Sequence, residues 1–133
     1  MVKKLFYIGL CIAILTVIVL NIVSLFNDPD SIKIEKNIYY NVQRKDILDH
    51  NGKYEIPPEV IDYCKIDDKI IVKWHPDYPI PAIYDKYDYG YSEKNIIMYW
   101  VIDLEKETQI GPMDLSEFDN YCKTGGLFPV FSR

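Results

Sequence analysis

Histidine, the side chain that most often serves metal sites and acid–base catalysis, occurs only at His50 and His75. His75 stands in a Trp-His-Pro-Asp run, where its imidazole and the carboxylate of Asp77 can share a metal ion or a proton. A catalytic zinc ion needs three protein ligands, and no third residue at ligand spacing accompanies this pair. We therefore expect His75 to end a strand before Pro76, and we predict neither a metal site nor a cofactor.

Two pairs of aspartates, Asp67 with Asp68 and Asp85 with Asp88, have the spacing of paired hydrolytic carboxylates. A glycosidase needs one carboxyl group in an apolar pocket that raises its pKa, whereas both pairs occur in polar turn sequences. The spacings of a calcium loop and of glycine-rich phosphate-binding loops are absent. The sequence therefore predicts a protein that is not an enzyme, with a small hydrolase built on aspartate and His75 as an alternative.

A tyrosine-rich segment is the densest cluster of side chains suited to binding. Tyrosine offers a large rigid surface and a hydroxyl group at low entropic cost, which is why interfaces favour it. We predict that the segment binds a protein partner, a sugar or a cationic ligand. The alternative is that its rings fold back over a sheet as a lid. The candidate residues are Tyr78, Tyr84, Asp85, Tyr87, Asp88, Tyr89 and Tyr91.

Three cysteines are present, and Cys11 lies within an apolar N-terminal segment. Cys64 and Cys122 remain as an even pair in the rest of the chain. In an oxidising compartment they can form a disulfide that closes a long loop. The alternative, two buried thiols in the core, stays open because sequence alone does not place their Cα atoms within bonding reach.

The N-terminal segment is too apolar for water. Residues 5–26 carry no charge and would form roughly 33 Å of helix, enough to cross the hydrocarbon core of a bilayer. A cleaved signal peptide would have a shorter apolar core and small residues at the cleavage site. Acylation at Cys11 would need a small residue in place of Leu10. We favour an uncleaved transmembrane anchor over both alternatives.

The charges beside this segment predict its orientation. Lys3 and Lys4 precede it, so residues 1–4 are expected to form a cytoplasmic stub. Residues 27–31 would then be a linker and residues 32–133 an extracytoplasmic domain. The abundance of Ile, Lys, Asn and Tyr is typical of AT-rich bacterial genomes, so we place the chain in a bacterial cell membrane, with the lipid bilayer as one partner.

The predicted extracytoplasmic part is acidic. It carries 13 basic and 20 acidic side chains, a formal charge of −7. Such a balance repels phosphate backbones and anionic head groups. We therefore exclude nucleic acid as a partner.

Hydrophobic periodicity predicts an α+β domain, with an antiparallel sheet of four or five strands and one C-terminal helix. Alternation over residues 32–42 predicts one half-buried strand. Residues 60–66 and 69–74 predict a hairpin that turns at Asp67 and Asp68. Seven consecutive apolar residues at 96–102 indicate a central strand that is covered on both faces.

The remaining segments are interpreted as connections and a helix. Residues 44–53 are polar, with a turn predicted at His50, Asn51 and Gly52, and residues 76–90 predict a long loop. Gly111 and Pro112 are expected to end the pairing of the last strand. Asp114 and Glu117 have the spacing of a capping box, so a helix should begin there and end at Gly125 and Gly126.

Three segments resemble small uncharacterised bacterial envelope proteins and lipoproteins. They are Tyr-Trp-Val-Ile-Asp at 99–103, Gly-Pro-Met-Asp-Leu-Ser-Glu-Phe at 111–118 and the hairpin arm 68–73. The resemblance covers roughly the last two-thirds of the domain. It implies an exported domain of unknown function and carries over no catalytic residue. Many of those proteins would carry an acylated cysteine, where this chain has an anchor helix.

Together these features predict a membrane-anchored extracytoplasmic binding or accessory module that engages a protein partner in a bacterial envelope. The charge of −7 and the small size suggest an alternative, an immunity-type protein that neutralises a basic toxin at the membrane. The small hydrolase is the second alternative.

Overall fold

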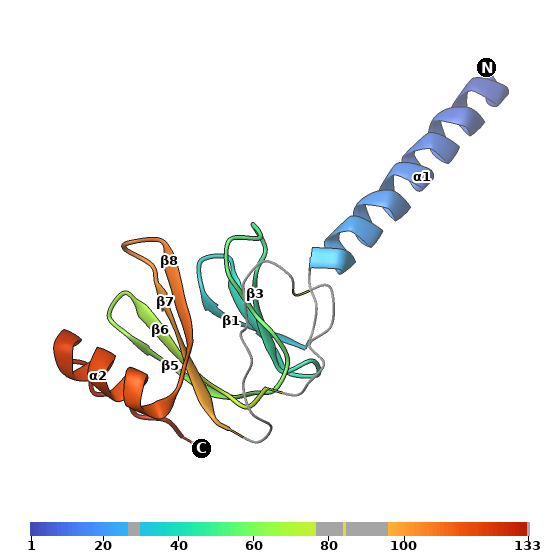
Figure 1. The fold of residues 1–133 in the computed structure, drawn as a ribbon. Coiled ribbons are helices and arrows are strands. Elements are labelled where there is room, and N and C mark those ends of the chain that lie inside the picture. Colours follow the sequence, from blue (N-terminus) through green and yellow to red (C-terminus); the bar gives the residue numbers. More distant parts are fainter. Residues whose placement is uncertain (27–29, 77–83, 85–95, 133) are drawn as a thin grey trace. The chain divides into compact units, whose positions relative to one another are not determined.

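The computed structural model describes residues 1–26, 30–76, 84 and 96–132 (Figure 1). The chain divides into two compact units, residues 1–31 and residues 32–133. The elements in chain order are α1 (Val2–Phe26), β1 (Ser31–Glu35), β2 (Ile38–Asn41), β3 (Asp46–Asp49), β4 (Glu55–Ile56), β5 (Val60–Ile66), β6 (Lys69–Trp74), β7 (Met98–Asp103), β8 (Thr108–Met113) and α2 (Leu115–Gly125).

Helix α1 makes up most of the first unit, and its stretch Val2–Asn21 is long and apolar enough to cross a membrane. Two polar side chains in this stretch donate hydrogen bonds to backbone carbonyls of the same helix. The hydroxyl of Thr16 donates to the carbonyl of Ile12, and the amide of Asn21 donates to the carbonyl of Val17, both at 2.8 Å. Such internal hydrogen bonds lower the cost of placing a polar side chain in lipid.

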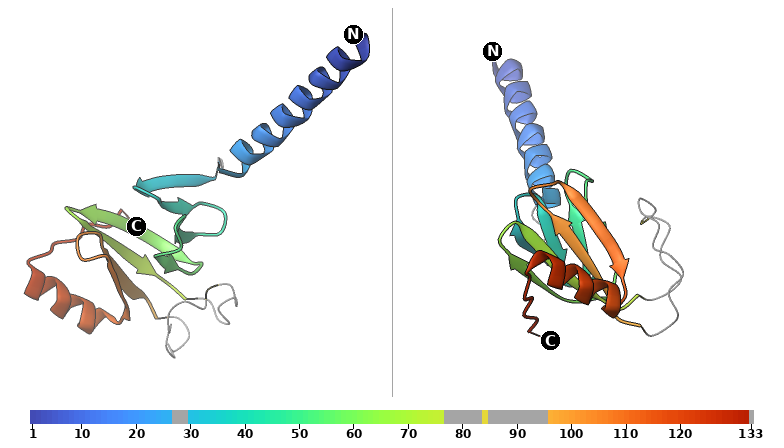
Figure 2. Two further views of the ribbon diagram at one scale, coloured as in Figure 1. Left: turned by 90° about the horizontal axis from the view of Figure 1, so that it is seen from above. Right: turned by 60° about the vertical axis from the view of Figure 1, so that its left-hand side comes forward.

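The described residues of the second unit form two four-stranded antiparallel sheets and one helix, which confirms the predicted α+β class. The first sheet has the order β1-β2-β3-β4 and the second the order β5-β6-β7-β8. The strands therefore number eight in two sheets, rather than four or five in one. Helix α2 lies against the second sheet (Figure 2).

Two layers of buried side chains hold the unit together. The larger layer lies between the sheets and includes Ile47, Ile56, Ile70, Trp74 and Trp100. The smaller layer lies between the second sheet and α2 and contains Ile71, Val101, Met113, Phe118 and Cys122. Because side chains alternate along a strand, β6 and β7 supply both layers. This confirms the prediction that residues 96–102 contain a central strand covered on both faces.

More of the polar sequence before residue 54 forms β-strands than we predicted. The expected single strand over 32–42 is two strands, β1 and β2, joined by a turn at Lys36, whose φ is 45°. The turn predicted at His50, Asn51 and Gly52 is present, and the polar residues before it contain β3. Asp46 and Asp49, at the two ends of β3, are buried, and their carboxylates accept hydrogen bonds there. These two polar residues are therefore not exposed, although their residue type would suggest exposure.

The second sheet also continues where Gly111 and Pro112 were expected to end it. β8 includes both residues, and pairing with β7 shifts register before Met113 meets Tyr99. A Cβ atom added at Gly111 would lie 2.7 Å from Cε3 of Trp100, and φ at this residue is 135°. Glycine thus permits a close approach between the backbone of β8 and the ring of Trp100.

The hairpin and the helix form as predicted. β5 and β6 pair across the turn at Asp67 and Asp68. Asp114 and Glu117 make the reciprocal bonds of a capping box, and Gly126 ends α2 with φ 64°. The side chain of Gln109 joins the edges of the two sheets, because it donates to the carbonyl of Glu55 at 2.7 Å and accepts from its amide at 3.0 Å.

Candidate binding groove

A groove of about 340 Å³ lies where the first sheet meets the start of the second. We call it the Lys45 groove. It combines an aromatic ring, two apolar side chains, an imidazole and one charge of each sign. Its lining residues are Tyr40, Lys45, Glu59, Val60, Ile61 and His75.

Short backbone bonds bring three distant segments together at this groove. The amide of Val60 donates to the carbonyl of Lys45 at 2.9 Å. The amide of His75 donates to the carbonyl of Glu59 at 3.0 Å. The turn after β2, the residue before β5 and the residue after β6 are thereby fixed to one another.

Lys45 and Glu59 both adopt left-handed backbone conformations, with φ of 54° and 77°. Each such conformation costs a residue with a side chain on the order of 1 kcal/mol, and it persists only where the surrounding structure holds it. Their side chains form an ion pair, with Nζ and Oε2 3.4 Å apart. Both are about half exposed, at 53% and 41%, so the pair is solvated and open to exchange with charges on a partner.

Tyr40 forms the aromatic side of the groove. Its ring lies 5.3 Å from the ring of Tyr63 on β5, at an angle of 52°. Burial raises the pKa of Tyr63. Tyr63 of the second sheet therefore packs against Tyr40 on the aromatic side of the groove.

A buried carboxylate stands directly beside the groove. Asp46 is fully buried next to Lys45, and its Oδ2 accepts from Nε of Arg44 at 2.9 Å and from the hydroxyl of Tyr84 at 2.6 Å. Burial, and then the bond to Asp46, raise the pKa of Tyr84 well above its usual range. Oδ1 of Asp46 is buried without a hydrogen-bond partner among the described residues.

The structure places one residue of the predicted tyrosine site. Tyr84 is 4% exposed and belongs to the core between the sheets, so at this position the ring folds onto the sheets instead of facing a partner. The other candidates, Tyr78, Asp85, Tyr87, Asp88, Tyr89 and Tyr91, lie outside the described residues. Tyr84 itself bonds to Asp46, the neighbour of Lys45, and His75 of the groove precedes the tyrosine-rich segment in the sequence.

The two histidines have separate environments. His75 lines the Lys45 groove, whereas His50 stacks on Tyr39, with ring centroids 4.1 Å apart. Asp77, the predicted neighbour of His75 in a shared site, lies outside the described residues. Within the part of the chain that the structure describes, no three His, Cys, Asp or Glu side chains group closely enough to hold a metal ion.

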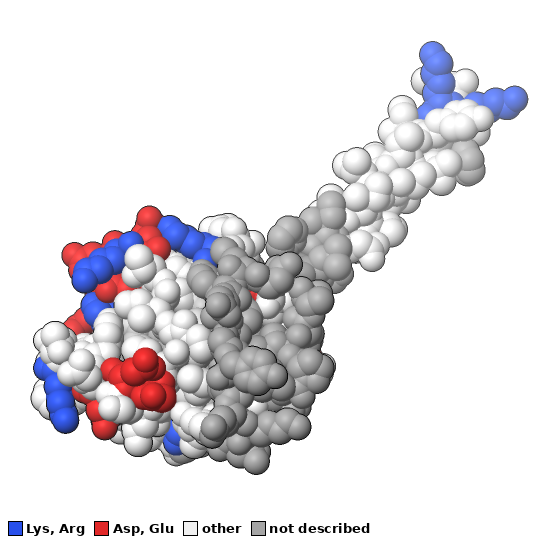
Figure 3. Space-filling view, in the orientation of Figure 1, with Lys and Arg blue, Asp and Glu red and all other residues white. Residues whose placement is uncertain are grey.

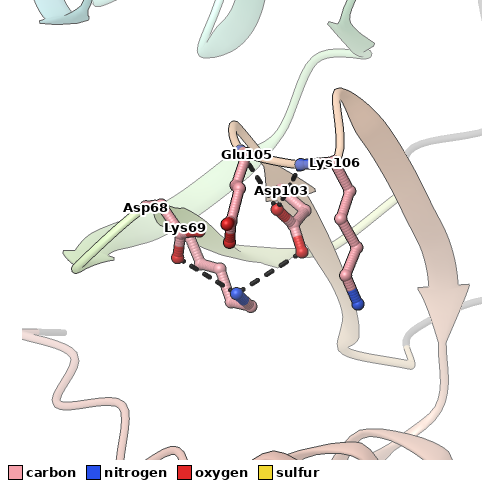
Figure 4. A network of polar contacts seen from close by, with 5 residues as sticks. All are labelled: Asp68, Lys69, Asp103, Glu105 and Lys106. Atoms are coloured by element: carbon pink, nitrogen blue, oxygen red, sulfur yellow. Dashed lines mark hydrogen bonds and ion pairs between the residues drawn. The ribbon is translucent and has the colours of Figure 1, made fainter.

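Asp68, one of the paired aspartates, belongs to an ionic network rather than to a carboxylate pair (Figure 4). Nζ of Lys69 lies 3.0 Å from Oδ1 of Asp68 and 3.4 Å from Oδ2 of Asp103. The backbone amides of Lys106 and Glu105 also donate to Asp103. The bond from Lys106, more than the charge of Lys69, lowers the pKa of Asp103. The network joins the turn before β6 to the turn after β7.

Cys64 and Cys122 lie in the layer between the second sheet and α2. Both are free thiols, Cys122 buried and Cys64 half-buried. Burial raises the pKa of each thiol. Cys11 is an exposed free thiol on α1.

Two other hollows offer less to a ligand. One of about 750 Å³ follows the outer face of α2, and its described lining comes from this helix alone. The other, of about 110 Å³, lies among turns and includes the ion pair between Lys53 and Glu107, whose atoms are 2.9 Å apart. The Lys45 groove combines side chains from both sheets, and Asp46, next to Lys45, bonds to Tyr84 of the tyrosine-rich segment.

The surface of the domain carries charges of both signs rather than of one sign. On the face of the domain in Figure 3, acidic and basic side chains lie close to each other. The visible described surface of α1 is uncharged except at its N-terminal end, where Lys3 and Lys4 lie. This distribution leaves the middle of α1 suited to lipid.

The comparisons with known proteins complete this description. No curated protein and no solved structure matches the chain. A family described as "Protein of unknown function (DUF3997)" matches residues 26–127, which include all eight strands and α2. The predicted resemblance to an uncharacterised family is thereby confirmed. The chain belongs to the family described as Protein of unknown function (DUF3997).

Proposed function

We propose that the chain is a single-pass protein of a bacterial cell membrane, whose extracytoplasmic domain binds a protein partner through the Lys45 groove. The observation that carries this proposal is the ion pair of Lys45 and Glu59, two solvated charges held by left-handed backbone conformations at the edge of one groove. Strained backbone conformations persist only where the surrounding structure holds them, and they cluster at ligand-binding sites.

The composition of the groove supports a protein partner. Protein interfaces combine an apolar and aromatic centre with a polar, solvated rim. Val60, Ile61 and Tyr40 supply the centre, and Lys45 and Glu59 supply rim charges of both signs. A single-sign ligand would meet one favourable and one unfavourable charge, whereas a protein surface can present a complement to each.

Membrane attachment is supported by α1, which is long and apolar enough to span a bilayer and carries Lys3 and Lys4 before its apolar stretch. In this proposal the N-terminus is cytoplasmic and the helix stays attached to the domain. The domain acts by binding, not by catalysis.

Photo-crosslinking in intact cells tests the groove. A photoreactive amino acid replaces Ile61, and in parallel chains Tyr87 or Tyr89, and adducts are resolved by mass. We expect a discrete protein adduct from position 61 that Lys45→Glu reduces at least tenfold. Lys53→Glu is the matched control, because Lys53 forms a similarly exposed ion pair with Glu107 away from the groove, and it should retain the adduct.

Two results would overturn the proposal. One is an absence of adducts above background at all three positions in chains shown to reach the membrane. The other is an equal loss of adduct in the Lys45→Glu and Lys53→Glu chains, which would assign the effect to net charge and not to the groove.

A further inference from the structure

We propose that Cys64 and Cys122 are a site of oxidative modification, where an intramolecular disulfide fastens α2 to the second sheet. This inference is independent of the Lys45 groove. It rests on where the two side chains point and on what surrounds them.

Strand register directs Cys64 toward α2. Cys64 lies directly opposite Ile71 in the antiparallel pair of β5 and β6. Directly opposed residues in such a pair project from the same face of the sheet. Ile71 is buried in the layer under α2, and Cys64 packs against the same layer. The side chain of Cys64, on the edge strand β5, therefore faces the layer that α2 and the C-terminal segment cover.

Helical spacing directs Cys122 toward the sheet. Cys122 follows Phe118 by four residues, so the two side chains share one face of α2. Phe118 stacks on Tyr99 of β7 with ring centroids 4.1 Å apart. Both Phe118 and Cys122 are buried in the layer that Cys64 also contacts. The two thiols thus enter one apolar layer from opposite sides.

The pKa of each thiol agrees with its position in this apolar layer. Burial is the main cause that raises the pKa of Cys64 and of Cys122. With raised pKa values, the thiols are poor nucleophiles near neutral pH, so their oxidation should be slow and should speed up at higher pH.

The reaction requires an oxidant, and we assign this role to a disulfide-bearing compound. The thiolate of Cys64 attacks one sulfur of the oxidant, which releases a thiol and leaves a mixed disulfide on Cys64. The thiolate of Cys122 then attacks Cys64 Sγ and expels the second thiol. Two protein thiols are oxidised, one external disulfide is reduced to two thiols, and the two protons pass to the released thiolates.

The C-terminal segment after α2 covers this site. Leu127 and Phe131 pack against the same apolar layer. The backbone amide and the hydroxyl of Ser132 both bond to Oδ2 of Asp62, two residues before Cys64. The C-terminal segment therefore lies over the layer that holds both cysteines.

The test uses the full chain in detergent, with Cys11→Ser to leave two thiols. The folded protein is incubated with oxidised glutathione, free thiols are tagged with a maleimide, and intact mass and linked peptides are measured. We expect an untagged monomer lighter by two hydrogen atoms, with a peptide linking residues 64 and 122. Because the bridge closes a long loop, the melting temperature of the oxidised protein should be roughly 10 °C higher than that of the reduced protein. Dithiothreitol should reverse this rise.

Controls separate this result from its alternatives. Cys64→Ser and Cys122→Ser chains should each keep one taggable thiol and show no oxidant-dependent rise in melting temperature. Glutathione retained on Cys64 while Cys122 stays free would overturn the proposal. So would two thiols that become linked only after unfolding in urea, or a linked chain that melts below the reduced one.

Discussion

The hydroxyl of Tyr84 donates a 2.6 Å hydrogen bond to the buried carboxylate of Asp46, 38 residues earlier in the chain. This bond connects the tyrosine-rich segment to the first sheet at the residue that follows Lys45. Arg44, which shares Oδ2 of Asp46, supplies a positive charge at the same carboxylate. One buried acid thus binds both Tyr84 and Arg44, directly beside Lys45 of the groove.

Tyr84→Phe should therefore destabilise the domain while keeping the ring. Removing a hydrogen bond to a buried charged group costs about 2 kcal/mol. Chemical denaturation measures the change in the free energy of unfolding. Tyr54→Phe is the control, because Tyr54 is similarly buried but its hydroxyl makes no hydrogen bond to the described residues. Equal costs for the two variants would contradict the role given to the bond between Tyr84 and Asp46.

The raised pKa of Tyr84 makes stability fall at alkaline pH. In the unfolded chain this phenol ionises near its usual pKa of about 10, whereas the folded chain keeps it neutral to higher pH. The stabilisation is complete below pH 10. It is lost at about 1.4 kcal/mol per pH unit as pH rises from there toward the folded pKa. Denaturation at several pH values should show a shallower decline for Tyr84→Phe, and parallel declines would contradict this account.

Gly111→Ala should be among the most damaging single changes in the second sheet. The new Cβ would lie 2.7 Å from Cε3 of Trp100 and 2.8 Å from the carbonyl oxygen of Tyr99, at a φ of 135°. We expect a loss of roughly 3 kcal/mol or more in unfolding free energy. At Gly52, φ is 70° and nothing lies within 4 Å, so Gly52→Ala should cost only about 1 kcal/mol. Similar losses at both sites would refute the steric argument.

Much of the second sheet could be predicted from sequence because its signals are local. Three short sequence patterns each predict the element in which they lie. They are the apolar run at 96–102, the hairpin turn at Asp67 and Asp68, and the capping box of Asp114 and Glu117. The first sheet was harder. Asp46 and Asp49 interrupt the apolar pattern of β3, and only the folded chain supplies the partners that let their carboxylates be buried.

The groove could not be predicted from sequence for a related reason. Lys45 and Glu59 are 14 residues apart in turns, and neither residue type signals a left-handed backbone. The prediction of Tyr84 as a binding residue is wrong at this position, because composition does not distinguish a ring that faces solvent from one that bonds to a distant aspartate. His75 was noticed as a possible ligand, and the structure places it beside Glu59 and Lys45.

Membrane attachment gives a separate expectation. If α1 is an uncleaved anchor, the intact chain should stay with membranes after carbonate extraction, and its mass should include residues 1–26. Protease added outside intact cells should digest the domain only when it is extracytoplasmic. A soluble mature polypeptide that begins after residue 26 would show instead that the helix is a cleaved signal.

The proposal that the Lys45 groove recognises a protein partner is tested most directly by reversing its ion pair. The double variant Lys45→Glu and Glu59→Lys keeps both charges and their attraction but exchanges their positions. Adduct yield from a photoreactive amino acid at position 61 is the measurement, with unchanged unfolding free energy as the check on the fold. The account predicts that the yield stays at least tenfold below that of the native pair, whereas full recovery would show that the pair only holds the turns together.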